Sequence, residues 1–331
     1  MRLLVYEHVT GGGMLSQSPP ASLVREADLM LRALLRDFAN QPVTLLTTRD
    51  PRLPPLEGVA TLVPTAQEDG TALFSRALDQ VDAAWPTAPE TDGILESLAR
   101  LTLMRGRVLV GCRPDAIAVA ASKARTAATL AAAGIAAVPT FTSPDQVPDW
   151  PGPWVVKPDD GAGSDDTRRV ADWTEARMRL TARPGHYVAQ PWLAGVPLSL
   201  SLLCQGAGME LLAVNRQRVT IAAGVVRLEG LEVNAEPDAD GRHLALARRI
   251  RDALPGLLGY VGVDLLATEH GPVVLEINPR LTTSYCALRA ARGVNVGARA
   301  FAAAVGATDI PPLPLGRGRT ITLTLARRRD D

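Results

Sequence analysis

The chain has 331 residues and a mass of 35.1 kDa, with 47% hydrophobic and 21% charged residues. This length allows roughly two or three compact units, and the composition is that of a globular enzyme or binding protein rather than a disordered chain. Because the formal net charge is +0, no global field would recruit nucleic acid or an anionic membrane. Apolar runs end well before about 18 residues and MRLLVYEH lacks a signal-peptide pattern, so we expect a cytoplasmic protein with no nucleic-acid or membrane partner.

The three cysteines lie far apart and form no CxxC pair, and the four histidines lack zinc-ligand spacing. A chain of this size does not need a disulfide framework, so we expect Cys112, Cys204 and Cys286 to be reduced, small hydrophobic residues. We therefore predict neither disulfides nor structural zinc.

Residues 1–121 alternate between strand and helix patterns. Strand-helix alternation predicts a small doubly wound α/β domain with a parallel sheet. The strands are expected at 3–7, 43–48, near 61–64 and at 108–111, and the helices at 21–38, 67–80, 92–104 and from Pro114 onward.

A glycine run, Gly11-Gly12-Gly13, follows the first expected strand. The GxGxxG spacing of dinucleotide-binding loops is absent, and Pro19-Pro20 interrupts the segment before the next helix. A flexible loop on the substrate side is at least as good an interpretation, and the sequence leaves both open.

Mixed helices and strands continue from Ser122. The segment KARTAATLAAAG is typical of a helix that ends at Gly134, and WVVKP (154–158) is typical of a strand. This half of the chain therefore has the pattern of an α+β unit. Further strands are expected at 187–193, 198–204, 209–214 and 320–325.

The stretch YVGVDLLATEHGPVVLEINPRLTTSY (260–285) is the most informative part of the chain, because it places charged and amide side chains on two apolar strands joined by a short turn. Side chains alternate along a strand, so Glu276 and Asn278 share one face while the alternate apolar residues, including Leu275, take the other. The polar groups of this hairpin are therefore expected to point the same way.

A three-residue loop at 269–271, with its glycine in a left-handed conformation, would place Asp264 directly opposite Glu276. Facing residues have Cβ atoms about 4.5–5.5 Å apart, where two carboxylates repel unless a cation compensates them. Two carboxylates and the Asn278 amide suit Mg²⁺, with Mn²⁺ as a substitute, and Mg²⁺ usually adds phosphate oxygens to such ligands. The alternative is an amphipathic hairpin whose acidic face meets solvent, with Arg280 as a surface counter-ion.

A second motif, WVVKPDDGAGSDDTRRV, joins a lysine at a strand end to a glycine-containing loop. Gly161, Gly163 and Ser164 would let backbone N–H groups approach phosphate oxygens, and Lys157 would place a positive charge beside them. Lys123 at a helix start opposes the helix dipole, and phosphate contact would explain its position. The alternative is an ordinary turn with a solvated lysine.

A third motif, YVAQPWLAGVPLSLSLL (187–203), is a strand, a short link and a second strand. Gln190, Trp192 and Leu193 could form a strip on which adenine stacks, with backbone groups contacting its edge. The alternative is ordinary packing of an aromatic residue among aliphatic ones.

Taken in order, these motifs resemble the ATP-grasp superfamily from about residue 115 to residue 300. Each motif is weak alone, whereas the ordered set is specific. The resemblance implies an α/β and α+β protein with an ATP-grasp fold, in which ATP lies between two subdomains that follow an N-terminal α/β (pre-ATP-grasp) domain. The expected boundaries are 1–121 for the N-terminal domain, 122–193 for the lid subdomain and 194–331 for the C-terminal subdomain with the metal site.

The resemblance also implies roles for individual residues. Lys123 and Lys157 match the lysines that contact ATP phosphates, the loop at 161–164 matches a mobile lid, and residues 190–193 match the lining of the adenine pocket. Arg280, together with Lys157, would act in phosphoryl transfer by stabilising the transferred phosphoryl group. Asp264, Glu276 and Asn278 match the metal ligands.

Finer signatures are similar to the tyramine–glutamate ligase type, which serves methanofuran synthesis. This resemblance covers nearly the whole chain, with two departures. The family's usual acidic partner of the ribose is not evident after Gly195, where VPLSLS stands, and Ser122 replaces the common Asp of an SDK sequence. The matching segments are WPTAPETDGIL (85–95), GCRPDAIAVAASK (111–123), VNRQRV (214–219) and INPRLTTSY (277–285).

This resemblance implies an ATP-dependent ligase. ATP would phosphorylate the side-chain carboxylate of L-glutamate, and an amine such as tyramine or tyrosine would attack the acyl phosphate to give an amide, ADP and phosphate. Two alternatives stay open, a ligase that adds glutamate or another amino acid to a different cofactor precursor, and a non-catalytic ATP-binding sensor. Members of the superfamily are often dimers, so a homodimer is expected by analogy only.

The acceptor site is harder to assign from sequence. An amine that carries its own carboxylate, such as tyrosine, would need a cation such as Arg216. Each candidate also fits a cap, a turn or an exposed position. The candidates border the expected cleft: Glu7, Glu90, Thr91, Arg216, Thr282, Thr283 and Ser284.

Overall fold

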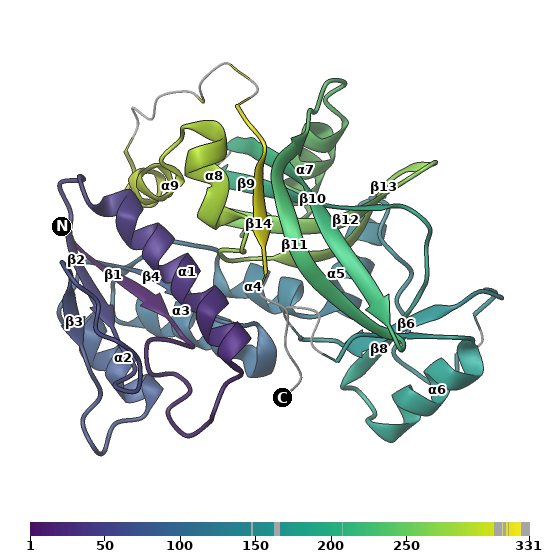
Figure 1. The fold of residues 1–331 in the computed structure, drawn as a ribbon, viewed down its shortest axis with the longest axis horizontal. Coiled ribbons are helices and arrows are strands. Elements are labelled where there is room, and N and C mark those ends of the chain that lie inside the picture. Colours follow the sequence, from purple (N-terminus) through teal and green to yellow (C-terminus); the bar gives the residue numbers. More distant parts are fainter. Residues whose placement is uncertain are drawn as a thin grey trace.

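The computed structural model describes residues 1–146, 148–161, 166–206, 208–307, 313, 316 and 318–325. Its strands form a five-stranded sheet near the N-terminus and a nine-stranded sheet in the rest of the chain. The two sheets lie at opposite sides of the molecule in Figure 1, with helices packed around them. In the part of the chain that the structure describes, no helix is both long and apolar enough to cross a membrane.

The N-terminal sheet is parallel, with strand order β3-β2-β1-β4-β5. Helices connect β1 to β2, β3 to β4 and β4 to β5, whereas a loop connects β2 to β3, so the predicted α/β domain with a parallel sheet is confirmed. The element bounds are β1 (Arg2–Glu7), α1 (Ala21–Phe38), β2 (Thr44–Thr48), β3 (Ala60–Leu62), α2 (Gly70–Leu78), β4 (Ala83–Thr87), η1 (Thr91–Gly93), α3 (Ile94–Met104) and β5 (Val108–Leu109).

Strand β4 was missed by the sequence analysis. Its sequence, AAWPT, contains Pro86, which lacks a donor for a sheet and therefore argues against a central strand. The sheet accepts it because β5 pairs only with Ala83 and Ala84, so that Pro86 lies beyond the end of β5. The carboxyl ends of β1 and β4 then meet at the reversal of strand order, where ligands bind in such sheets.

The second sheet has the order β13-β12-β9-β10-β11-β7-β6-β8, with β14 paired to β11. All pairings in this sheet are antiparallel, which agrees with the predicted α+β pattern. The element bounds are α4 (Pro114–Ala121), α5 (Lys123–Ala132), β6 (Trp154–Pro158), β7 (Arg168–Val170), α6 (Trp173–Ala182), β8 (Tyr187–Pro191), β9 (Val196–Gln205), β10 (Gly208–Ala222), β11 (Val225–Glu236), α7 (Arg242–Ala253), β12 (Gly259–Thr268), β13 (Gly271–Asn278), α8 (Tyr285–Arg292), α9 (Val296–Ala304) and β14 (Ile321–Thr324).

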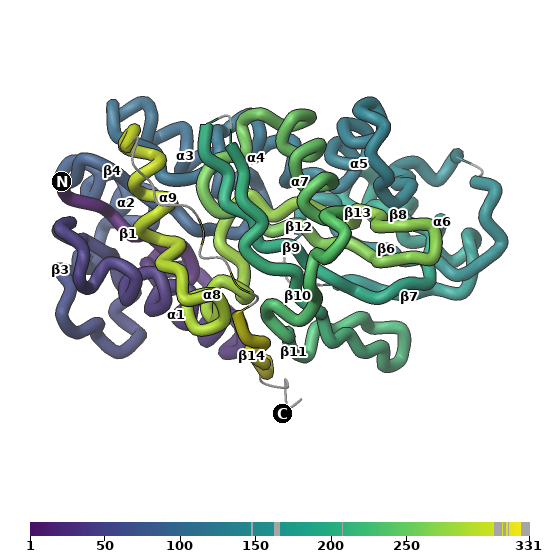
Figure 2. The backbone as a smooth tube through the Cα atoms, turned by 90° about the horizontal axis from the view of Figure 1, so that it is seen from above, coloured from purple at the N-terminus to yellow at the C-terminus, as the bar shows by residue number. Residues whose placement is uncertain are grey.

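The long hairpin of β10 and β11 connects the two parts of this sheet. Strand β10 extends well beyond the predicted 209–214, and the hairpin tip reaches β7, where Val225 pairs with Arg168. The backbone N–H of Arg169 also donates to the Gly224 carbonyl at 2.8 Å. Figure 2 shows the hairpin running from the centre of the molecule to the β6–β8 strands. The hairpin tip therefore joins β7, β6 and β8 to the rest of the sheet.

The β12–β13 hairpin reaches the predicted register by a different route. Asp264 does pair with Glu276, as expected. The prediction of a three-residue loop is wrong, however, because Thr268 pairs with Gly271 and only two residues form the turn. A bulge in β13 beside Asp264 supplies the residue that the shorter turn lacks. Because of this bulge, the buried apolar residues of β13 are Val274 and Ile277, and Leu275 does not join them as strict alternation predicts.

Helix α1 fixes the N-terminal domain against α8 and α9. The buried Asp37 carboxylate accepts hydrogen bonds from the Tyr285 hydroxyl at 2.6 Å, from Arg289 at 3.2 Å and from the Gly297 backbone N–H at 3.2 Å. Thr283 also donates to Glu26 of α1. These bonds hold the segment after β13, which carries several site candidates. The three cysteines are free thiols, as predicted.

The Gly11-Gly12-Gly13 run is explained by close packing. The Gly11 N–H donates to the Glu7 carbonyl at 2.7 Å and the Gly13 N–H to the His8 carbonyl at 2.9 Å, so the chain folds back onto the end of β1. A Cβ on Gly11 would lie 2.4 Å from the Glu7 carbonyl oxygen and 2.5 Å from Thr48 Oγ1. Only glycine fits such a close approach of backbone to backbone.

We expect Gly11→Ala to destabilise the protein by about 1–3 kcal/mol, because the added methyl group must displace the backbone or Thr48. Denaturant unfolding would measure the change. Gly208→Ala is the matched control, since its Cβ would meet nothing nearer than the Gln205 carbonyl oxygen at 3.4 Å. Equal stability of the two variants would contradict this explanation.

Candidate active site

Two carboxylates face each other across β12 and β13. Asp264 pairs with Glu276 in the ladder, and Asn278 lies two residues further along the same strand. The Asn278 amide donates to Asp264 Oδ2 at 3.3 Å. The three residues predicted as metal ligands are therefore brought together by the hairpin.

Two lysines from other elements point at the same carboxylates. Nζ of Lys123, at the start of α5, lies 3.8 Å from Glu276 Oε2, and Nζ of Lys157, on β6, lies 3.7 Å from the same oxygen. Both lysine side chains are largely buried, with 6% and 11% of their surface exposed. The alternative of solvated lysines is therefore wrong, because buried ammonium groups need anionic partners.

The pKa values of the two carboxyl groups shift in opposite directions. Burial, reinforced by the charge of Glu276, raises the pKa of Asp264 to about 8. Burial also acts to raise the pKa of Glu276, but the charges of Lys123 and Lys157 outweigh it and hold that pKa below its ordinary value. Burial lowers the pKa of the Lys157 ammonium, against the opposing charge of Glu276. The lysines therefore stabilise Glu276 as an anion but do not do the same for Asp264.

The carboxylates and Asn278 form a donor set that fits Mg²⁺. Hard oxygen donors from one or two carboxylates, completed by phosphate oxygens, are the usual ligands of this ion. In the described ranges there is no group of three or more Asp, Glu, His or Cys that could hold a metal. Lys123 and Lys157 stand beside the carboxylates, where they would face phosphate oxygens.

Lys123 also anchors the glycine-containing loop. Its Nζ donates to the carbonyl oxygens of Asp159 at 3.2 Å and Gly161 at 2.9 Å. Ser122 caps α5 by accepting from the Arg125 N–H at 3.1 Å, so the serine that replaces the family's aspartate still serves as a cap. Gly163 and Ser164, which were predicted to contact phosphate, lie outside the described residues.

Arg280 follows β13 and pairs with Glu90 of the N-terminal domain. Its Nε lies 2.9 Å from Glu90 Oε1, and its Nη2 donates to Oε2 at 3.0 Å. Burial acts to lower the pKa of Arg280, but the charge of Glu90 prevails and raises it. The side chains of Arg280 and Glu90 are 12% and 5% exposed, so Arg280 is not a surface counter-ion.

The loop that carries Glu90 also contacts the loop after β6. Thr91 Oγ1 donates to the Asp160 carbonyl at 3.3 Å, and the Asp92 backbone N–H donates to Asp160 Oδ2 at 3.0 Å. Asp92 adopts a left-handed conformation with φ of 55°, which non-glycine residues rarely take. One short segment of the N-terminal domain thus touches both Arg280 and Asp160 in the loop after β6.

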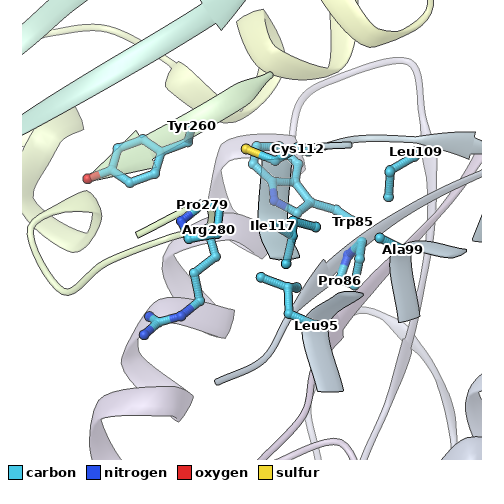
Figure 3. A pocket seen from close by; sticks show the side chains of 11 residues that line it. Trp85, Pro86, Leu95, Ala99, Leu109, Cys112, Ile117, Tyr260, Pro279 and Arg280 are labelled. Carbon is cyan, nitrogen blue, oxygen red and sulfur yellow. The ribbon is translucent and has the colours of Figure 1, made fainter. Parts of the chain in front are cut away.

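Figure 3 shows the junction behind this contact, where Pro279 and Arg280 lie beside Leu95 and Ile117 of the N-terminal half. The cavity there measures about 10 Å³, which is about the volume that one water molecule needs. It is therefore a packing junction and too small for a substrate.

The other acceptor candidates are occupied by partners within the fold. The Glu7 carboxylate accepts from the backbone and hydroxyl of Thr10, both at 2.7 Å, so it shapes the loop after β1. Thr282 and Ser284 belong to a hydroxyl network with Tyr260 at 2.8 Å and 3.0 Å, respectively. Arg216 is exposed and pairs with Glu236.

The expected adenine strip lies at the edge formed by β8 and its following link. Gln190 is buried and its amide donates to Thr140 Oγ1 at 3.0 Å, so the side chain already serves packing. Trp192 lies under the Arg169 guanidinium, 5.4 Å from the ring centroid, and Leu193 is partly exposed beside it. Contact of these residues with adenine stays a prediction.

The sequence analysis missed one side chain of the site, Gln217 on β10. Its amide donates to Asp264 Oδ1 at 3.0 Å. Alternation in VNRQRV places Asn215 and Gln217 on the face opposite to Arg216 and Arg218. It does not show that this face meets Asp264, because β9 lies between β10 and β12 and strand order is not encoded in the local sequence.

Comparison with known proteins supports the resemblance of these motifs to the ATP-grasp superfamily. The family profile of the ATP-grasp domain matches residues 120–284, and that of the pre-ATP-grasp domain matches residues 43–117. Two curated relatives are tyramine–L-glutamate ligases of Methanocaldococcus jannaschii and Methanocaldococcus fervens, each 28% identical over 211 residues. These alignments cover 64% of this chain and 59% and 62% of the relatives, so the chain spans about three fifths of their length.

Solved structures show the same fold. An ATP-grasp superfamily protein from Archaeoglobus fulgidus superposes with a TM-score of 0.72 at 22% identity, covering 98% of this chain and all of the other. D-alanine–D-alanine ligase from Bacillus anthracis, solved with ATP, gives a TM-score of 0.65 at 14% identity, covering 92% of this chain and 97% of the other. The fold, the order of the motifs and the matching profiles together show that this chain belongs to the ATP-grasp family, with a pre-ATP-grasp domain before its ATP-grasp domain.

Proposed function

We propose that this protein is an ATP-dependent carboxylate–amine ligase that joins the γ-carboxylate of L-glutamate to an amine, with tyramine as the first candidate. The observation that carries the proposal is the half-buried carboxylate pair of Asp264 and Glu276, with two buried lysines facing Glu276 and Arg280 following on the same segment. A structural hairpin gains nothing from that arrangement, since facing like charges are destabilising. A site for metal and nucleoside triphosphate explains it.

The reaction divides into two balanced steps. The γ-phosphoryl group of ATP is transferred to a carboxylate oxygen of glutamate, which gives ADP and an acyl phosphate. The amine nitrogen then attacks the carbonyl carbon, phosphate leaves with the bridging oxygen, and the nitrogen loses a proton. No nucleophilic residue of the protein is required, because positioning and charge neutralisation carry phosphoryl transfer.

The protein's own residues would supply most of that neutralisation. Lys123 and Lys157 would bind phosphate oxygens, and the planar guanidinium of Arg280 can hold two oxygens of the transferred phosphoryl group at once. Asp264, Glu276 and Asn278 would hold Mg²⁺ or Mn²⁺, which when bound neutralises triphosphate charge. The lid loop would exclude water that hydrolyses the acyl phosphate.

The acceptor end of the cleft favours an amine without a carboxylate. A tyrosine acceptor would need a cation, and the candidate for that role, Arg216, is exposed and paired with Glu236. Glu90 instead offers a buried carboxylate next to Arg280, which suits an ammonium group. The name of the curated relatives, tyramine–L-glutamate ligase, supports the same acceptor. We further propose a cytoplasmic role in methanofuran-type cofactor synthesis and, by analogy with the superfamily, a homodimer.

An ADP-release assay with Mg²⁺, L-glutamate and a panel of amines tests the proposal. We expect turnover that requires both glutamate and an amine, with tyramine preferred over tyrosine. Turnover only with other amino acids or amines would indicate a ligase for a different cofactor precursor. ATP binding without any amine-dependent turnover would indicate an ATP-binding sensor and would contradict the proposal.

We expect Asp264→Asn to stabilise the protein without metal or nucleotide at about pH 8.5 but to change it little at about pH 5. Because the folded-state pKa of Asp264 is raised to about 8, the stabilisation from its proton is complete below the ordinary pKa of the unfolded chain and is lost as the pH rises to and through the folded-state pKa. The amide never ionises and so avoids that loss. Thermal unfolding at both pH values, with the exposed-site control Asp145→Asn, would reveal it. The same shift at both pH values would count against the charge assignment.

We expect Glu276→Gln to fold normally and to lower turnover at least about 10²-fold, because it removes a predicted metal ligand and the anion that faces both lysines. Circular dichroism and ADP release would measure the two properties. Glu269→Gln in the exposed turn is the control and should keep full activity. Wild-type turnover in the Glu276 variant would remove the metal assignment.

We expect Arg280→Lys to lower kcat roughly 10–100-fold, since lysine keeps the charge but cannot hold two oxygens in one plane. Steady-state kinetics with saturating ATP would show the loss. Arg242→Lys, in an exposed pair with Asp240, provides the matched control. An unchanged kcat would mean that Arg280 serves only its ion pair with Glu90.

A further inference from the structure

Gln217 makes a contact with the carboxylate pair that no motif of the site predicts. Its Nε2 donates to Asp264 Oδ1 at 3.0 Å, while the Asn278 amide donates to Oδ2 at 3.3 Å. Each oxygen of the Asp264 carboxylate therefore accepts one amide hydrogen bond. Two opposed donors fix the rotation of a carboxylate in a way that one donor does not.

The contact crosses a whole strand of the sheet. Gln217 lies on β10 and Asp264 on β12, and β9 runs between them. Neighbouring strands are about 4.8 Å apart, so the side chain has to span about 9.5 Å between strand axes, diagonally to its neighbours. The shorter side chain of Asn215, on the same face, donates its amide hydrogens to Ser199 and Ser201 of the adjacent strand β9, one strand short of β12. Only a long amide at position 217 makes the bond.

The chemistry of the side chain matters as much as its length. A lysine or arginine beside Asp264 would neutralise the carboxylate and compete with a cation for it. An amide N–H orients the carboxylate and leaves its charge available. The two arginines that flank Gln217 are exposed and bond elsewhere, Arg216 to Glu236 and Arg218 to Thr324.

From this geometry we infer that Gln217 is a positioning residue of the metal site, which holds the Asp264 carboxylate in the orientation that a divalent cation requires. The inference rests on the proposed function, because it assumes that Asp264 is a metal ligand. Hydrogen-bond partners of ligating carboxylates are a common part of metal sites, and their loss typically weakens metal affinity about 10–100-fold.

A measurement of Mn²⁺ binding to the full chain tests the inference. Binding is monitored through the loss of the electron paramagnetic resonance signal of free Mn²⁺, with a non-hydrolysable ATP analogue present. We expect Gln217→Leu and Gln217→Asn each to bind Mn²⁺ about tenfold more weakly than the wild type, because neither can reach Asp264 with a donor. The asparagine variant keeps an amide and a hydrophilic surface. A loss of Mn²⁺ affinity in this variant would therefore show that the length of the side chain matters, and not only its polarity.

Thr220→Val on the same strand is the control, since Thr220 is exposed and bonds only to Glu229 in the described contacts. It should bind Mn²⁺ like the wild type, and all variants should unfold at similar temperatures without metal. If both Gln217 variants bind Mn²⁺ within about twofold of the wild type, the inference about Gln217 is overturned and the proposed function is not affected. Absence of Mn²⁺ binding by the wild-type protein would overturn the proposed function and, with it, this role of Gln217.

Discussion

Repulsion between two half-buried carboxylates is the constraint around which the site is arranged. The ladder of β12 and β13 sets Asp264 opposite Glu276, and partial burial removes much of the water that would screen their charges. In the absence of a cation, the fold stabilises only one of them as an anion, through Lys123 and Lys157. The other is held near neutrality. Such a pair favours binding of a divalent cation, because the cation compensates the repulsion between the two carboxylates that the fold brings together.

The surrounding groups come from distant parts of the chain, and each depends on the fold to reach the pair. The lysines stand on α5 and β6, whereas Arg280 leaves the end of β13. Glu90 comes from the N-terminal domain, and the same loop contacts Asp160 in the loop after β6. Docking of α1 on α8 and α9 keeps that domain in place. The candidate site is therefore built by residues of both the N-terminal domain and the ATP-grasp domain.

Sequence patterns predicted which candidate site residues lie together better than they predicted the details of the fold. Spacing and alternation located Asp264 opposite Glu276, although the structure reaches that register with a shorter turn and a bulge, which hydrophobic patterns do not specify. Strand β4 was missed because Pro86 is acceptable only where its neighbour strand has ended, a tertiary fact. Gln217 was missed for a similar reason, since its partner lies two strands away and strand order is not written in local sequence.

Nucleotide binding with and without a divalent cation tests the central claim most directly. Calorimetric titration of the wild-type protein with a non-hydrolysable ATP analogue, first with Mg²⁺ and then with EDTA, compares the two states. If the carboxylate pair is a cation site that opens toward triphosphate, binding should be tight with Mg²⁺ and much weaker without it. Equal affinity under both conditions, or no binding with Mg²⁺, would contradict the account.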